Sequence, residues 1–217
     1  MIIKFLKIII SLLLFISTSY AEQLKVFEFT EEELTTLEVR KVRNAKENTT
    51  YTIGKNDKGN YIKAVADSSA SGLGKKVKIN LNVTPIINIT WKVEKDLSGI
   101  DEQTKKGHDY AARVFVIKKT GATPLSNRAI NYVFSSNLNI DHNNPSPYTK
   151  KSIDYVLSTT KESFNEWVTV KANVKQHFKE LHNLDVNELN GIAIMSDTDN
   201  SEKKSVAYYQ NIYFSSE

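Results

Sequence analysis

The 217-residue sequence contains no cysteine. This absence excludes a disulfide framework, a thiolate metal site, a cysteine nucleophile and a lipid-attachment cysteine near the N-terminus. We therefore expect the folded chain to be held together by its packed core alone. After residues 1–21 the sequence also lacks any apolar stretch close to the roughly 20 residues that cross a bilayer, so it predicts no transmembrane segment there.

A strong excess of one charge sign is missing as well. Lys4 and Lys7 lie in the first 21 residues, which leaves 27 basic residues against 25 acidic ones in the rest of the chain. Short basic clusters at residues 74–78, 150–151 and 203–204 have neither interleaved aromatic residues nor a known nucleic-acid motif. We interpret them as solvated strand ends and predict no nucleic-acid partner.

Two common catalytic or metal-binding patterns are absent. No G-x-S-x-G segment is present, so the nucleophile elbow of serine hydrolases is not indicated. His177 and His182 are five residues apart on a predicted helix and point in different directions, which excludes the paired i, i+4 arrangement of metal ligands.

The first 21 residues have the pattern of a secretory signal peptide. Lys4 and Lys7 precede an apolar core at residues 8–16, and Ser19-Tyr20-Ala21 supplies small residues at the third-last and last positions. We expect cleavage there, a mature chain beginning near Glu22, and a periplasmic or secreted protein. The remaining residues, 22–217, have the length of one domain.

Most of this region alternates between apolar and polar residues with a period of two, which predicts short β-strands. Clusters of turn-forming residues at 56–59, 68–74, 120–126 and 141–147 separate the strands. Strands at this spacing predict an all-β, jelly-roll-like sandwich. The predicted strands are residues 24–30, 50–55, 60–66, 75–83, 85–95, 110–119, 128–136, 153–159, 166–174, 191–196 and 205–214.

One helix is predicted at residues 172–184, where Val174, Phe178 and Leu181 recur at steps of four and three and form a single apolar stripe. Residues 30–46 are compatible with a short helix that leads into a strand.

Two motifs carry a resemblance to a protein family. Residues 109–114 have the sequence Asp-Tyr-Ala-Ala-Arg-Val, and residues 195–200 have Met-Ser-Asp-Thr-Asp-Asn. In these motifs and in weaker matches along the mature chain, the sequence resembles the bacterial family Domain of Unknown Function 3047. His108 departs from the family's acidic residue and Phe134 from its Trp. The resemblance implies an exported β-sandwich and no particular reaction.

The acidic turn near the C-terminus holds Asp197, Asp199 and Asn200 within four positions. It does not fit the calcium loop of an EF-hand, which needs Gly at its sixth position and Glu at its twelfth. A looser calcium site built from these three residues and Asp109 is one hypothesis, because their oxygens suit Ca²⁺. The other is structural: Asp and Asn side chains often bond to nearby backbone N–H groups and fix tight turns.

Arg113 interrupts a strand that is apolar on both faces. A guanidinium removed from water needs a carboxylate partner. Asp197, Asp199 and Asp109 are the candidates, and we predict a structural charge cluster of Arg113, Asp109 and Asp197 beneath the acidic turn.

The function that we expect is non-catalytic binding or association with the cell envelope, with glycan as the first ligand class to test. On the last strand, Tyr209, Asn211 and Tyr213 share one face and are candidates for a ligand-facing strip, whereas Trp91 is assigned to the core. Tyr148 and His142 are candidates for the rim of the site.

The alternative is a carboxylate-based or metal-assisted hydrolase or lyase that acts on envelope polysaccharide. Two carboxylates flanking a sugar bond can serve as general acid and base. The residues that would supply them are Asp101, Glu102, Asp109, Asp197 and Asp199.

Overall fold

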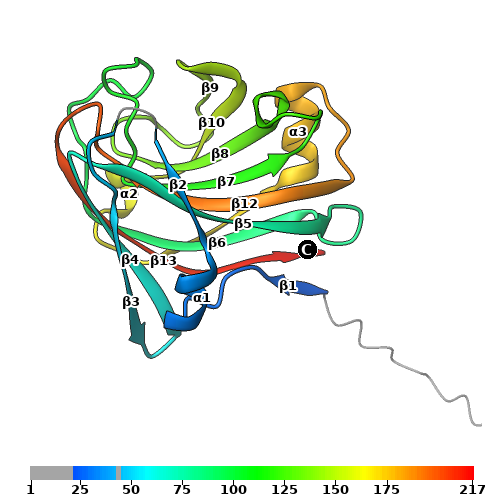
Figure 1. The fold of residues 1–217 in the computed structure, drawn as a ribbon, viewed down its shortest axis with the longest axis horizontal. Helices are drawn as coiled ribbons and strands as arrows, with labels where there is room; N and C mark the ends of the chain where they lie inside the picture. The colour runs from blue at the N-terminus through cyan, green and yellow to red at the C-terminus, as the bar shows by residue number, and fades with distance from the viewer. Residues whose placement is uncertain (1–21, 43–44) are drawn as a thin grey trace, which may run out of the picture.

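The chain forms two β-sheets packed face to face (Figure 1). The computed structural model describes residues 22–42 and 45–217, so the predicted signal peptide at residues 1–21 lies outside the described residues. The two sheets confirm the predicted all-β sandwich. Most strand pairs are antiparallel, whereas β8 and β10 pair in parallel. Sheet A has the strand order β11 (Val168–Asn173), β6 (Ile86–Lys95), β13 (Lys204–Ser215), β4 (Gly59–Asp67), β3 (Thr50–Asn56), and β1 (Gln23–Lys25) also pairs with β13. Sheet B has the strand order β2 (Glu38–Lys41), β5 (Ala70–Asn80), β12 (Glu188–Asp197), β7 (Ala112–Lys118), β8 (Arg128–Ser135), β10 (Thr149–Thr159), β9 (Asn143–Ser146).

Alternation along the strands gives each sheet one face toward a shared apolar core. On β12, Ile192 and Ile194 belong to the core, whereas Ala193 between them points to the outside of sheet B. Trp91 has no exposed surface, as predicted, and its indole N–H donates to Ser158 Oγ at 2.9 Å. This bond satisfies the one donor that burial of the indole would otherwise leave unpaired.

Helices are few and short. α3 (Val174–His182) confirms the predicted helix, and it buries Val174 and Phe178 against the core at one end of the sandwich (Figure 1). α1 (Glu31–Thr36) leads into β2, which confirms the interpretation of residues 30–46. α1 begins after Thr30, whose Oγ1 accepts a hydrogen bond from the Glu33 N–H at 3.0 Å.

Two helical segments were not predicted. α2 (Thr160–Ser163) and the 3₁₀ helix η1 (Pro124–Ser126) are too short to show a helical period in the sequence. Within the described ranges, no helix combines the length and the apolar character needed to cross a membrane.

Two of the predicted turns contain strands. β9 lies within residues 141–147, and the prediction of a turn at 68–74 is wrong from Ala70 onward, where β5 begins. Serine and glycine made this stretch look like a turn. In the structure Gly72 and Gly74 lie opposite Met195 and Ala193 of β12, in the middle of sheet B.

A β-bulge interrupts the last strand. From Gln210 to Tyr213 the chain of β13 advances three residues, while its partner β6 advances two, from Thr90 to Asn88. Asn211 sits in the bulge with a φ of 48°, in the left-handed region that Asn tolerates better than most residues.

The bulge changes which side chains of β13 face the core. Tyr209, Ile212 and Phe214 all belong to the core, although strict alternation would place Tyr209 opposite the other two. Tyr208 and Tyr213 therefore lie on the outer face of sheet A.

Candidate functional site

Arg113 and Asp197 form a buried ion pair, which confirms the predicted partnership. Arg113 Nε donates to Asp197 Oδ1 at 2.8 Å, and Nη2 donates to Oδ2 at 2.5 Å and to the His108 carbonyl at 2.7 Å. The two residues lie on neighbouring strands, β7 and β12, and each is at most 3% exposed. Two parallel N–H donors match the two carboxylate oxygens in the geometry that Arg favours.

Burial and charge act in opposite directions on both members of this pair. Burial raises the pKa of the Asp197 carboxyl, and the Arg113 guanidinium opposes that rise. Burial alone would lower the pKa of Arg113, but Asp197 and further carboxylates outweigh it, so this pKa lies above its ordinary value. The two-donor contact requires an ionised carboxylate, so the pair remains charged as a unit.

Asp109 holds the acidic turn from a separate segment, the loop of residues 96–111. Its Oδ1 accepts from the Asn200 side-chain amide at 2.8 Å, and its Oδ2 accepts from the Ser201 backbone N–H at 2.6 Å. The turn joins β12 in sheet B to β13 in sheet A. The expectation that the turn's own Asp and Asn side chains fix it is therefore wrong in detail. The fixing carboxylate comes from Asp109, almost 90 positions earlier in the sequence.

The same loop buries two further acidic groups. His108 Nε2 lies 2.6 Å from Asp154 Oδ2 on β10, and Asn131 donates to Asp154 Oδ1 at 2.5 Å. Glu102 accepts from the Ser135 hydroxyl and from the Ser136 backbone N–H. No pattern in the sequence indicates these partners, because they lie on β8 and β10 and in the turn after β8, 20 or more positions from the loop.

These contacts give the buried carboxylates at the polar end of the sandwich a structural role. Glu102, Asp109 and Asp197 are each at most 2% exposed and already accept internal hydrogen bonds. Burial raises the pKa of Glu102. Asp101 is exposed but accepts from the backbone N–H of Gln103 in its own turn. A general acid and base must reach the substrate, and the three buried carboxylates lie beneath protein.

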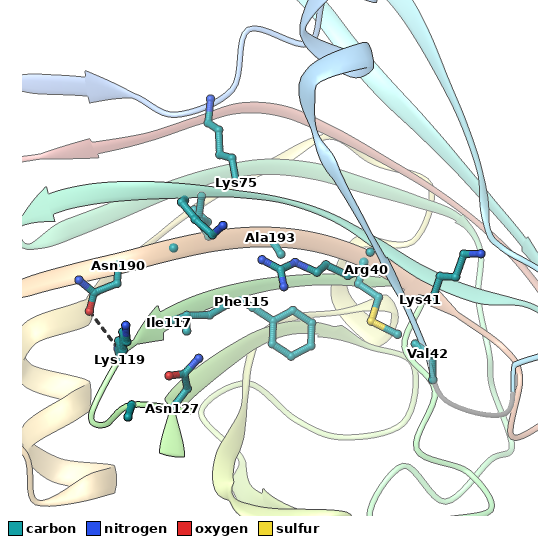
Figure 2. A pocket seen from close by; sticks show the side chains of 16 residues that line it. Arg40, Lys41, Val42, Lys75, Phe115, Ile117, Lys119, Asn127, Asn190 and Ala193 are labelled. Atoms are coloured by element: carbon teal, nitrogen blue, oxygen red, sulfur yellow. Dashed lines mark hydrogen bonds between the residues drawn. The ribbon is translucent and has the colours of Figure 1, made fainter. Parts of the chain in front are cut away.

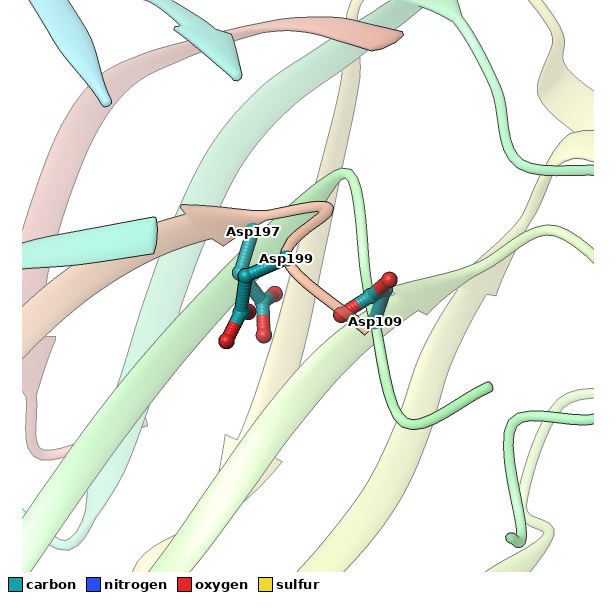
Figure 3. Close-up of side chains that lie close together, drawn as sticks. All are labelled: Asp109, Asp197 and Asp199. Carbon is teal, nitrogen blue, oxygen red and sulfur yellow. The ribbon is translucent and has the colours of Figure 1, made fainter. Parts of the chain in front are cut away.

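Asp109, Asp197 and Asp199 are the residues from which a cation site would be built. Their nearest carboxylate oxygens all lie within 4.8 Å of one another. Figure 3 shows Asp197 and Asp199 side by side at the end of β12, with Asp109 reaching toward them from the other loop. Arg113 already neutralises Asp197, and amide N–H groups of the turn already donate to Asp109, which favours the structural interpretation over the calcium hypothesis.

The prediction that Tyr209 faces a ligand is wrong. Tyr209 is fully buried, because the bulge turns it toward the core. Its hydroxyl donates to the Met195 carbonyl at 2.5 Å and accepts from the Arg113 backbone N–H at 3.0 Å. Tyr209 therefore ties sheet A to the strands of sheet B beneath the charge cluster.

The other predicted ligand residues divide between the two sheets. Asn211 and Tyr213 line a shallow hollow of about 570 Å³ on the outer face of sheet A, together with Thr90 and Thr169. Tyr148 and His142 flank β9 at the far edge of sheet B. Tyr148 is 56% exposed, and its hydroxyl donates to Asn200 Oδ1 at 2.5 Å. The structure does not bring these two pairs into one site.

A cluster of three aromatic residues lies on the outer face of sheet A, and sequence analysis missed it. Tyr61, Trp167 and Tyr208 come from β4, from the residue before β11, and from β13. Their ring centroids are separated by 5.6 to 5.9 Å, with tilted or edge-to-face geometry. We call these three residues the aromatic cluster. Nothing in the sequence shows that these three segments are close.

Polar and charged groups surround the aromatic cluster. Lys92 Nζ lies 4.6 Å from the centre of the Tyr208 ring, within the range of a cation–π contact. The Tyr208 hydroxyl donates to Glu94 at 2.6 Å. Farther along the same face, Thr90 and Thr169 share a hydrogen bond of 2.8 Å. This face thus combines aromatic rings with donors and acceptors.

The chain is thus an all-β sandwich that buries a group of carboxylates at one end and carries the aromatic cluster on the outer face of sheet A. The chain belongs to the family described as "Protein of unknown function (DUF3047)", whose model matches residues 35–213. This match confirms the resemblance found in the two sequence motifs. No curated protein matches the sequence.

Several solved structures have a similar arrangement of strands. The family 11 carbohydrate-binding module of the cellulase Lic26A-Cel5E from Clostridium thermocellum is 10% identical, with a TM-score of 0.46 over 90% of this chain and 94% of that one. The xyloglucanase domain of NopAA from Sinorhizobium fredii is 10% identical, with a TM-score of 0.43 over 77% and 92%. A cellulase derived from Cel12A of Rhodothermus marinus is 7% identical, with a TM-score of 0.44 over 90% and 100%. At these scores the likeness is one of general shape, and no ligand or activity follows from it.

Proposed function

We propose that this protein is a non-catalytic glycan-binding protein whose ligand lies on the outer face of sheet A. The observation that carries the proposal is the aromatic cluster on the outer face of sheet A, in which the partly exposed Tyr61 and Trp167 pack against Tyr208, itself 8% exposed. Large aromatic side chains ordinarily add to the core, and a cluster of them on the surface marks an interaction site.

The chemistry of this face suits a sugar chain. A sugar ring has an apolar face of C–H groups, which stacks on an aromatic ring, and a rim of hydroxyls, which needs donors and acceptors. Trp167 and Tyr61 are half-buried, so each is held by its neighbours and still offers surface. Thr90, Thr169 and Tyr213 continue the face toward the shallow hollow. Sites of this kind combine aromatic contact with a few placed polar groups.

The carboxylates that favoured an enzyme support the non-catalytic form of the proposal. Glu102, Asp109 and Asp197 are buried, and each accepts a backbone hydrogen bond: Glu102 from Ser136, Asp109 from Ser201 in the acidic turn, and Asp197 from Tyr110. They lie on the sheet B side of the sandwich, away from the aromatic cluster in sheet A.

A glycan array with the purified protein tests the proposal. For a glycan that the wild type binds, we expect Trp167→Ala to weaken binding at least about tenfold, equivalent to about 1.4 kcal/mol. Tyr148→Ala is the matched control, because Tyr148 is an exposed aromatic residue on the other sheet, and it should bind as the wild type does. Equal melting temperatures would show that both variants fold.

Binding that persists unchanged in Trp167→Ala, or a wild-type protein that binds no glycan on a broad array, would refute the proposal. The hydrolase alternative has a separate readout. We expect no release of reducing ends from envelope polysaccharide, and release that disappears in Asp197→Asn would establish the enzyme instead.

A further inference from the structure

The outer face of sheet B is covered over only part of its length. Near the charge cluster, the loop of residues 96–111 packs Tyr110 onto Val133 of β8 and Val156 of β10, and these form a small second core. Farther along β7 and β12, the same face is open. A cavity of about 520 Å³ lies there, bordered by β2 at one side (Figure 2). We call this cavity the trough.

Small residues at outward positions create the trough. β12 contributes Gly191 and Ala193, and β5 contributes Gly72 at the position opposite Met195. Side chains at these positions would fill the space above the sheet. A Cβ added to Gly72 would lie 3.0 Å from the Ile194 carbonyl and 3.6 Å from the Cβ of Arg40, its partner across the ladder of β2 and β5.

The floor of the trough is apolar. Phe115 and Ile117 point outward from β7, and Ala193 and Met195 lie beside them on β12. In Figure 2 the ring of Phe115 and the side chain of Arg40 both border the cavity. An apolar floor that water covers is a favourable place for an apolar ligand group, because contact removes both surfaces from water.

The rim of the trough is positively charged. The cationic side chains at its rim are Arg40, Lys41, Lys76 and Lys119, and no Asp or Glu is among the described residues that line it. Lys75 also borders the trough, but its Nζ lies over the Phe27 ring and bonds Glu33, on the other face of the sheet. Glu38 pairs with Arg40 and Lys76 from outside the trough. Within residues 22–42 and 45–217, Lys41 and Lys119 have no ion-pair partner. A net positive charge therefore remains at the rim.

We propose that the trough binds a small organic anion with an apolar body, of the type represented by a medium-chain carboxylate. The body would lie on Phe115 and Ala193, and the carboxylate would reach the cations at the rim. A volume of about 520 Å³ falls within the range of small-molecule pockets. An inorganic anion would leave the floor uncovered, and a neutral sugar would leave the rim charges unused. This site lies on the opposite sheet from the aromatic cluster, so it does not depend on the glycan proposal.

Calorimetric titration of the purified protein with three probes tests the proposal. Decanoate has both a charge and an apolar body, octyl glucoside has an apolar body without charge, and trigalacturonate has charge without an apolar body. We expect decanoate to bind at least about tenfold more tightly than either of the others. Its affinity should also fall as salt is added, because the rim cations are exposed to solvent.

Variants separate the two parts of the site. Ala193→Phe should weaken decanoate binding at least about tenfold by filling the floor. Lys119→Gln should weaken it severalfold and reduce its salt dependence, whereas Lys171→Gln on the exposed side of β11 removes the same charge elsewhere and should change nothing. Lys119 is exposed, so its variant will fold even where Ala193→Phe does not.

Three results would overturn the proposal. The first is decanoate binding no more tightly than octyl glucoside. The second is tighter binding of trigalacturonate, which would make the site one for acidic sugars. The third is decanoate binding that neither Ala193→Phe nor Lys119→Gln affects.

Discussion

Replacing Arg113 by Met should cost this protein much of its stability. The Arg113 guanidinium donates three hydrogen bonds, two of them to Asp197, and both residues are almost completely buried. The variant leaves the Asp197 carboxylate without its counter-charge in the interior, and removal of one partner from a buried pair costs about 3–5 kcal/mol. For a chain of this length, a loss of about 3–5 kcal/mol lowers the melting temperature by about 6–20 °C.

Urea denaturation followed by circular dichroism measures this loss as a change in the free energy of unfolding. The double variant Arg113→Met/Asp197→Leu removes both charges, so we expect it to lose less than the two single variants added together. Lys204→Met is the matched control. It breaks the exposed pair of Lys204 with Asp67 and should cost less than about 1 kcal/mol.

A loss below about 1 kcal/mol in Arg113→Met would refute the reasoning, because it would mean that the Asp197 carboxylate is hydrated or neutral once the guanidinium is gone. Strict additivity in the double variant would refute it too, since it would show that the two side chains do not act as a pair.

Four further predictions follow. Tyr209→Phe should lower the free energy of unfolding in urea by about 1–3 kcal/mol, because two buried backbone groups lose the hydroxyl that pairs with them; an unchanged value would contradict this. Burial lowers the pKa of His177, so below pH of about 6.5 the unfolded chain takes up a proton at this histidine before the folded protein does. The contribution of His177 to stability should therefore be complete above pH of about 6.5 and fall as the pH drops below it. Melting temperatures measured across this pH range should fall less in His177→Phe. Gly54→Ala should weaken any glycan binding, because its new Cβ would lie 2.4–2.5 Å from ring atoms of Tyr61 and displace that ring from the aromatic cluster. Thermal melting should give equal midpoints in excess calcium and in excess chelator, because internal donors already bind Asp109 and Asp197 and leave only the Asp199 carboxylate for an ion; a rise with calcium would establish an ion site.

Local pattern accounts for the parts of the fold that the sequence predicts well. Alternation located most strands, since a half-buried strand must place apolar residues at every second position. Arg113 could be assigned a carboxylate partner because a guanidinium on an apolar strand has few other ways to be neutralised. The correct partner among three candidates, Asp197, was then set by its place at the end of the neighbouring strand.

Non-local geometry accounts for the parts that the sequence did not predict. The aromatic cluster combines residues from positions 61, 167 and 208, and only strand order brings them together. The trough depends in part on Gly72, which lies in a stretch that resembles a turn in the sequence and forms part of the open sheet surface in the structure. The assignment of Tyr209 failed because a single bulge reverses the alternation that the prediction assumed.

The bulge at Asn211 also means that the final strand is one residue longer than its ladder with β6 requires. A chain without this residue would have a straight, regular terminal strand. It would still present Ile212 and Phe214 to the interior, because without Asn211 the core residues Tyr209, Ile212 and Phe214 stand at every second position of the strand. Position 211 is therefore one that the last strand can lose while the same side chains fill the core.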